Sequence, residues 1–332
     1  MPSESRLRLS RRRMLGLGGL GVLTACGTPR SAEVSAGSGG AELRTITGCV
    51  YAKNHASSPL FWSRFAPEGF RVEIKVVTSS SDVQNGLQAG HLDAGLLGPY
   101  SPLLSTDTGQ PFTGKIIGMC ARGGLGLIGR KGRVESVDEL KGKTIGLPPA
   151  GQQNLMLDIA LERAGLKRGA GVKAVPVSYA DAPVALARGD VDAFISTEPQ
   201  CSQSIVDGVG VRLRGLYNTP IGDFNTAIWV SPQLMSDPDA VRAVARMQQG
   251  AAEYLSPGGV NDQGRWHDLL VGQFGYTEAV FAEVLTNIGA LWRFDDQRIG
   301  QVAATGAQLV AEGLLHAEPD YEEFFARAYW NL

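Results

Sequence analysis

Hydrophobic and polar residues follow two different periods along this chain, and segments of the two kinds alternate between about residue 43 and residue 230. Residues 70–77 alternate apolar and polar side chains, which is typical of a strand with one buried face. From Asp237 onward apolar residues recur every three or four positions, and Asp237 followed by Pro238 is a typical helix start. This alternation predicts an α/β fold with mostly parallel sheets, flanked by helices and joined by right-handed crossovers.

The same patterns place the individual elements. We expect strands at 43–51, 70–77, 92–97, 115–119, 125–128, 143–147, 172–177, 191–195, 211–216 and 226–230. We expect helices near 58, at 82–89, 152–164 and 182–187, a long one from 237, and later ones at 264–274, 278–287, 297–312 and 321–329. A Ser-Val-Asp-Glu capping box at residues 136–139 predicts one more short helix that ends at Gly142.

One short pattern occurs twice, at residues 86–95 and at residues 185–194. Each copy has the pattern of a helix end, a glycine suited to a left-handed cap, and a buried strand that opens at an aspartate. The matching residues are Leu87, Gly90, Asp93 and Ala94 in the first copy, and Leu186, Gly189, Asp192 and Ala193 in the second. The repeat predicts two similar lobes with a cleft between them: lobe I from 43–121 and 215–332, and lobe II from 122–214. Such a cleft favours binding over catalysis.

Composition narrows the class of protein. The chain has 332 residues, of which 43% are hydrophobic and 19% charged, as in a soluble globular protein with ample material for a core. Its net charge of −2 gives no basic excess, so nucleic acid is not an expected partner.

The first 26 residues have the pattern of an export signal. Arginines up to Arg13 precede about ten weakly apolar residues, too few to span a bilayer of roughly 30 Å. Residues 10–15 resemble the twin-arginine export signal, and Leu-Thr-Ala-Cys at 23–26 looks like a bacterial lipobox in which Cys26 is lipidated. The Gly-, Ser- and Ala-rich composition of residues 27–42 predicts a flexible tether after it. We therefore expect an extracytoplasmic protein, lipid-anchored to the cell membrane.

The other three cysteines are Cys49, Cys120 and Cys201. They allow at most one disulfide, and none has the spacing of a metal site. We expect them to be buried apolar residues, and we expect no metal or other cofactor.

Four predicted strand-to-helix joints share a proline at or near the first helical turn. In parallel sheets such joints lie together at the carboxyl ends of the strands, where ligands bind. The free N–H groups of a helix start can hold a carboxylate, sulfonate or phosphate. The joints are Ser58-Pro59, residues 99–102 with Tyr100 and Ser101, residues 148–154, and Glu198-Pro199.

Residues 43 to about 320 resemble the substrate-binding proteins of the nitrate, sulfonate and taurine family of ABC importers. The resemblance lies in Asp-Glu-Leu-Lys-Gly-Lys-Thr-Ile-Gly at 138–146, in the helix at 154–166, and in residues 179–194 followed by Glu198-Pro199. It implies the two-lobed type II periplasmic-binding-protein fold, which closes on a captured small-molecule solute. It also implies a membrane permease and ATPase as partners and no catalytic activity. We expect the protein to be a monomer.

The chain departs from that family at the start of the helix near 152. Sulfonate binders usually carry Gly-Ser or Gly-Ser-Thr there, whereas this chain has Ala150, Gly151, Gln152, Gln153 and then Asn154. The hydroxyls that would hold an oxyanion are therefore missing, although backbone N–H groups remain. Glu198 would suit an amine or a ring N–H if it faced the cleft, and would repel an anion. The sequence is compatible with either a small organic molecule or an oxyanion as the solute.

Lys53, Asn54 and His55 suggest an alternative function. Pyrimidine-precursor synthases of thiamine biosynthesis have the same fold and use a lysine and a histidine in the first loop, and their precursor-binding relatives keep an Asn-His there. An exported enzyme or a pyrimidine-precursor-binding protein is therefore the alternative. The synthases' cysteine-rich iron motif is missing here. A solvated loop with a polar cap would also explain these residues.

Overall fold

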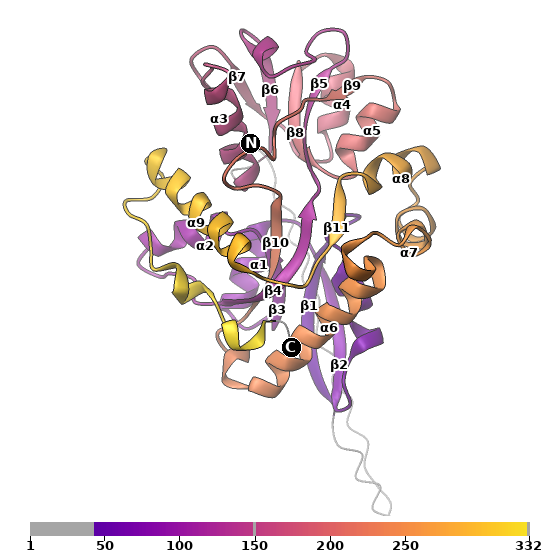
Figure 1. Ribbon diagram of the computed structural model, residues 1–332, viewed down its shortest axis with the longest axis vertical. Helices are drawn as coiled ribbons and strands as arrows, with labels where there is room; N and C mark the ends of the chain where they lie inside the picture. The colour runs from indigo at the N-terminus through magenta and orange to yellow at the C-terminus, as the bar shows by residue number, and fades with distance from the viewer. Residues whose placement is uncertain (1–42, 149–150, 331–332) are drawn as a thin grey trace, which may run out of the picture. The chain divides into compact units, whose positions relative to one another are not determined.

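The computed structural model describes residues 43–148 and 151–330 (Figure 1). The predicted export signal, Cys26 and the tether lie outside the described residues, as do Pro149 and Ala150. In the part that is described, no helix combines the length and the apolar character needed to cross a membrane.

Two sheets make up the lobe that contains the first strands. Strand β1 (Arg44–Tyr51) pairs in parallel with β2 (Phe70–Val77) over their whole length. A four-stranded antiparallel sheet has the order β11-β4-β10-β3. Its strands are β3 (Ala94–Leu97), β4 (Lys115–Gly123), β10 (Phe224–Val230) and β11 (Ile288–Ala290).

The other lobe is built on a five-stranded mixed sheet with the order β7-β6-β8-β5-β9. Strand β6 runs parallel to both β7 and β8, whereas β5 runs antiparallel to β8 and β9. The strands are β5 (Leu125–Arg130), β6 (Thr144–Leu147), β7 (Lys173–Pro176), β8 (Ala193–Thr197) and β9 (Gly210–Arg212). The strands are therefore not mostly parallel: β4 and β10 lie in a wholly antiparallel sheet, and β5 runs against both of its neighbours in the mixed sheet.

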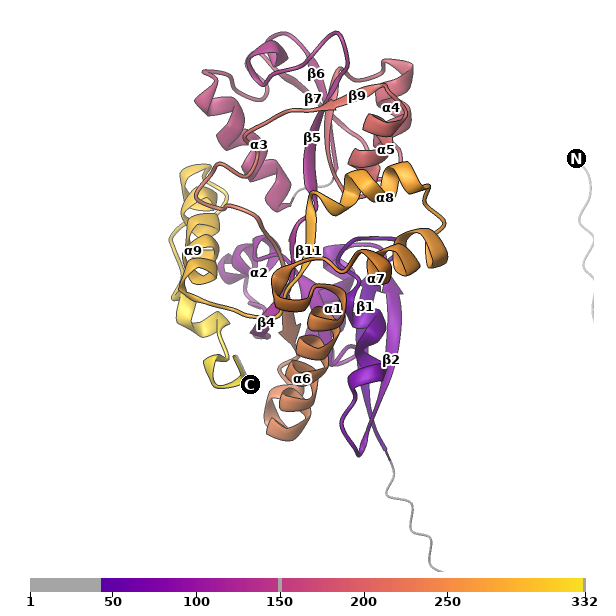
Figure 2. The ribbon, with the colours of Figure 1, turned by 45° about the vertical axis from the view of Figure 1, so that its right-hand side comes forward.

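Helices flank these sheets in both lobes, and Figure 2 shows α8 beside α5. Short 3₁₀ helices run over Ser58–Phe65, Asp138–Leu140 and Tyr321–Phe324. The α-helices are α1 (Ser80–Gln88), α2 (Tyr100–Leu104), α3 (Gln152–Arg163), α4 (Ala182–Arg188), α5 (Gln200–Val206), α6 (Pro238–Leu255), α7 (Gln263–His267), α8 (Glu278–Leu285) and α9 (Asp296–Ala311).

The repeated pattern has the same structure in both copies. Gly90 and Gly189 both have left-handed backbone, with φ of 72° and 85°. The Asp93 carboxylate accepts the Thr47 N–H at 2.8 Å, and its own N–H donates to the Thr47 carbonyl at 2.8 Å. Asp192 makes the same two bonds with Thr144, at 2.9 Å and 2.8 Å. Each aspartate therefore joins its strand to the neighbouring strand, and the repeat is a structural device.

Helix α6 is the main buried helix of the first lobe. The Asp237 carboxylate accepts the N–H groups of Asp239 and Ala240, so the predicted cap is confirmed. In the buried stripe lies Gln248, 2% exposed. Its Oε1 accepts the Ser58 hydroxyl and the Trp62 indole N–H, and its Nε2 donates to the Met119 and Leu291 carbonyls. This one amide links α6 to three other segments.

Two predicted helices differ in the structure. At 136–139 the capping box does not form: the 3₁₀ helix starts after Val137, and Glu139 accepts the Glu135 N–H instead of an N–H at the cap. Three helical residues are too few to need the predicted reciprocal cap. The helix expected at 264–274 is α7 followed by a π-helical stretch, Asp268–Gln273.

The chain passes between the lobes at two adjacent places. Gly123 and Gly124, both with left-handed φ, join β4 to β5. Residues 213–223 lead from β9 back to β10, and there the Tyr217 hydroxyl both donates to the Leu125 carbonyl and accepts the Leu125 N–H, each at 2.7 Å. The two crossings are thereby tied together.

Candidate functional site

The first predicted group of site residues lies in the loop after β1. Lys53 has an exposed side chain and a φ of 48°, and its carbonyl accepts the Tyr276 hydroxyl at 3.4 Å. Asn54 is used within the loop, since its Oδ1 accepts the Ala56 N–H at 2.9 Å. His55 is different, because its side chain turns into the protein and is 2% exposed. Of the three residues, the structure places only His55 in the interior.

His55 is buried without a hydrogen-bond partner among the described residues. Neither Nδ1 nor Nε2 has one. The ring lies against Gly124, where an added Cβ would come within 1.9 Å of Nε2. Burial lowers the pKa of His55 to about 4, although the Glu198 carboxylate acts in the opposite direction. The imidazole is therefore neutral near pH 7, with one donor and one acceptor nitrogen available.

Glu198, predicted as a ligand contact, is fully buried and already bonded on both oxygens. Oε1 accepts from Arg212 Nη2 at 2.7 Å and from Asn287 Nδ2 at 3.0 Å. Oε2 accepts the Ser202 N–H at 3.0 Å. Arg212 Nη2 also lies 3.5 Å from the Glu283 carboxylate on α8. Sequence reasoning did not select Arg212, for which the only signal was one arginine between Val211 and Leu213.

The start of α3 reaches from the second lobe to the first. Gln152 Nε2 donates to the Phe224 carbonyl on β10 at 2.8 Å. Its Oε1 is buried with no hydrogen-bond partner in the described part of the chain, and it lies 3.2 Å from where a Cβ on Gly98 would stand. Gly151 is the N-cap of α3, and the buried Asn154 Oδ1 also has no partner among the described residues. Gly98, directly before the joint at residues 99–102, therefore lies close to Gln152, and whether Tyr100 faces the start of α3 stays a prediction.

Tyrosines lie near these residues. Gln153 Nε2 donates to the Tyr179 hydroxyl at 2.8 Å. Burial raises the pKa of Tyr179 to about 12, and it also raises the pKa of Tyr51, whose hydroxyl lies 3.2 Å from Ser80 Oγ. Tyr51 and Tyr179 come from different lobes and were not among the predicted site residues.

The last two predicted site residues, Tyr100 and Ser101, lie at the start of α2. Tyr100, 8% exposed, is the first residue of α2, and burial raises its pKa. Its charged neighbours are Glu312, the C-cap residue of α9, and Asp158 and Arg168 of the second lobe. Ser101 is half-buried. The roles of Tyr100 and Ser101 in binding stay predictions.

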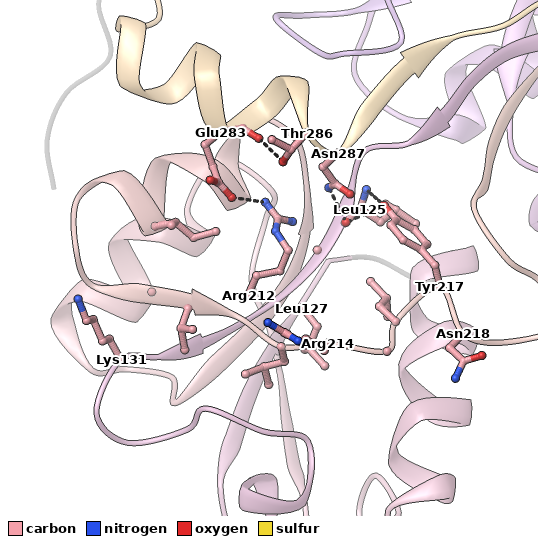
Figure 3. Close-up of a pocket in the computed structure, with 17 residues that line it drawn as sticks. Leu125, Leu127, Lys131, Arg212, Arg214, Tyr217, Asn218, Glu283, Thr286 and Asn287 are labelled. Carbon is pink, nitrogen blue, oxygen red and sulfur yellow. Dashed lines mark hydrogen bonds and ion pairs between the residues drawn. The ribbon is translucent and has the colours of Figure 1, made fainter. Parts of the chain in front are cut away.

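A cavity of about 740 Å³ lies elsewhere, beside β9 and α8 (Figure 3). It contains none of the predicted site residues. Arg212, bonded to Glu198 as described above, lines it. The cavity and the predicted site are therefore neighbouring but different places.

Comparison with known proteins identifies the fold and the family. The periplasmic aliphatic sulfonate binding protein SsuA from Escherichia coli superposes with a TM-score of 0.69 at 17% identity, over 86% of this chain and 92% of that chain. The alkanesulfonate-binding protein SsuA from Xanthomonas axonopodis pv. citri, bound to MOPS, gives 0.67 at 22% identity, over 85% and 96%. The desulfurization enzyme DszB gives 0.57 at 18% identity, over 86% and 97%.

At these identities the structural likeness establishes a shared fold, the two-lobed fold of periplasmic binding proteins. No curated protein sequence matches the chain significantly. The sequence model of the NMT1/THI5-like family matches residues 64–257, more than half of the chain. The chain therefore belongs to the NMT1/THI5-like family.

Proposed function

We propose that this chain is the extracytoplasmic solute-binding protein of an ABC importer. In this proposal Cys26 carries the lipid anchor, and the lobes hand a captured solute to a membrane permease driven by its ATPase. Family membership and a fold shared with two sulfonate-binding proteins support the proposal.

One observation carries the assignment of the site. Buried polar atoms without a partner among the described residues occur on segments of both lobes: α3 bonds to β10 through Gln152, and His55 lies against Gly124 at the crossing between the lobes. A buried polar group without a partner costs about 1–3 kcal/mol, so such groups need a ligand or water to bond them. They include His55 Nδ1 and Nε2, Gln152 Oε1 and Asn154 Oδ1.

These atoms support an uncharged solute that donates hydrogen bonds. The Phe224 carbonyl fixes the orientation of the Gln152 amide, so Oε1 is left as an acceptor. His55 is neutral, and Glu198 and Arg212 neutralise each other. A sulfonate would find no free buried cation among these described groups, and desolvating it would be unfavourable.

Native mass spectrometry of protein purified without denaturation tests the proposal by weighing the co-purified solute. Titration calorimetry with that solute should then show about tenfold weaker binding for Gln152→Ala, which loses an acceptor and a bond between the lobes. Gln203→Ala is the control, because its amide bonds Asp207 on the surface.

Equal affinities for Gln152→Ala and the wild type would place the solute elsewhere. A co-purified solute that changes chemically during incubation would favour the exported enzyme instead. A strong anion in the site would contradict the proposed solute chemistry but not the binding function.

A further inference from the structure

The cavity beside β9 and α8 has the size and the walls of a small-molecule site. Its volume of about 740 Å³ lies in the range of ligand pockets. One wall is β9 with the segment that follows it, 210–218, and another is α8 with Glu283, Thr286 and Asn287. Figure 3 shows the Arg212 side chain of β9 in contact with Glu283 of α8, so the two walls meet there.

Strand β9 presents a free backbone edge along this cavity. Among the described strands it is last in its sheet and pairs with β5 alone. The Leu213 N–H donates to the Leu127 carbonyl, and the Lys131 N–H to the Val209 carbonyl. Because backbone groups alternate along a strand, those of Arg212 point away from β5, toward the open edge.

The charged residues that line the cavity are mainly cationic. The cavity lining contains three cationic residues, Lys131, Arg212 and Arg214, and one anionic residue, Glu283. Arg212 shares its charge with Glu198 and Glu283 through Nη2, while its Nη1 is buried and forms no hydrogen bond with a described residue. The Arg214 side chain is exposed. The exposed Arg214 guanidinium on the cavity wall suits a carboxylate.

The rest of the lining is mostly apolar. The apolar part consists of leucine, valine and isoleucine side chains. These suit the hydrocarbon part of a ligand rather than a second polar group. These residues are Leu125, Leu127, Ile205, Val211, Leu213 and Leu216.

We propose that this cavity is a second binding site, separate from the predicted solute site, for a small amphipathic carboxylate. The carboxylate lies beside Arg214, and the apolar body lies along the leucines. The cavity walls include the crossing segment 213–218 and helix α8, which reaches toward the second lobe. Occupancy therefore favours one degree of lobe closure over another, in proportion to the difference in affinity.

Titration calorimetry with octanoate tests this site, and octanamide is the uncharged probe of the same shape. We expect the wild type to bind octanoate saturably. Arg214→Gln should bind octanoate at least about tenfold more weakly, and the wild type should bind octanamide at least about tenfold more weakly than octanoate. Arg188→Gln is the matched control, since Arg188 is exposed in the same lobe and does not line the cavity. Thr286→Trp, which fills the cavity from an exposed position, should abolish binding.

The predicted solute site supplies the second control. Gln152→Ala should change octanoate affinity much less than Arg214→Gln does, because Gln152 does not line the cavity. Absence of saturable binding up to about 10 mM octanoate, or equal affinities in wild type, Arg214→Gln and Thr286→Trp, would overturn the proposal. Loss of octanoate binding in Gln152→Ala alone would overturn it too, because octanoate would then occupy the solute site.

Discussion

Burial holds the His55 imidazole neutral, and this makes stability depend on pH. Its folded pKa of about 4 is below the ordinary value of 6.5, so the unfolded chain binds more protons between these two values. The contribution of the neutral His55 to stability is fully present above about pH 6.5, and it is lost as the pH falls toward 4. From pH 7 to pH 5 this one residue should remove about 2 kcal/mol from the free energy of unfolding.

Denaturant unfolding at both pH values checks this prediction, with His55→Gln as the comparison. The wild type should lose about 2 kcal/mol more than the variant, since all other titrating groups are common to both. Identical losses would mean that His55 is accessible to protons in the folded state.

Replacing Glu198 should destabilise the protein more than replacing Glu283, the half-buried carboxylate that pairs with the same arginine. Glu198→Gln leaves Arg212 with only the carboxylate of Glu283, 3.5 Å away and 32% exposed. Breaking a buried ion pair costs about 3 kcal/mol, whereas Glu283→Gln should cost less than about 1 kcal/mol. Urea titration of both variants decides this. Similar losses would show that Arg212 is stabilised by other contacts.

At the scale of elements, Gln248 should be the polar residue of α6 whose substitution destabilises the protein most. Gln248→Met keeps the size but leaves the Trp62 N–H, the Met119 carbonyl and the Leu291 carbonyl without this partner. We expect a loss of at least about 3 kcal/mol in the free energy of unfolding. Gln249→Met, one position along the helix, should stay within about 0.5 kcal/mol. A small effect at Gln248 would mean that water replaces the amide.

The elements could be predicted where local chemistry decides them. Asp237 and Pro238 set the start of α6 in sequence and structure alike, because a cap needs only its own turn. The capping box at 136–139 failed for the opposite reason, since a helix of three residues, Asp138–Leu140, gives it nothing to cap. Strand direction was also missed, because the pairing of β4 with β10 depends on residues far apart in the chain.

At the scale of the whole molecule, the two-lobed arrangement followed from the repeat, but the details of the site did not. The joints at Gly98 and Gln152 lie at the carboxyl ends of strands in two different sheets, and they could be expected to face each other because ligands bind at those strand ends. That Glu198 would be occupied by Arg212 could not be expected, because no spacing in the sequence relates β9 to Glu198. A buried acid and a site acid look the same in a sequence.

The aspartates of the repeat provide matched probes of folding cooperativity. Asp93→Ala and Asp192→Ala each remove a charge-assisted bond to a threonine N–H, and each should cost about 2 kcal/mol. Asp192 also pairs with Arg133, but that arginine is 55% exposed and adds little. Because β4 continues directly into β5 and α3 bonds to β10, we expect one calorimetric transition that both variants lower by similar amounts. Two transitions, each moved by only one variant, would mean that the lobes unfold independently and that closure joins two separately stable bodies.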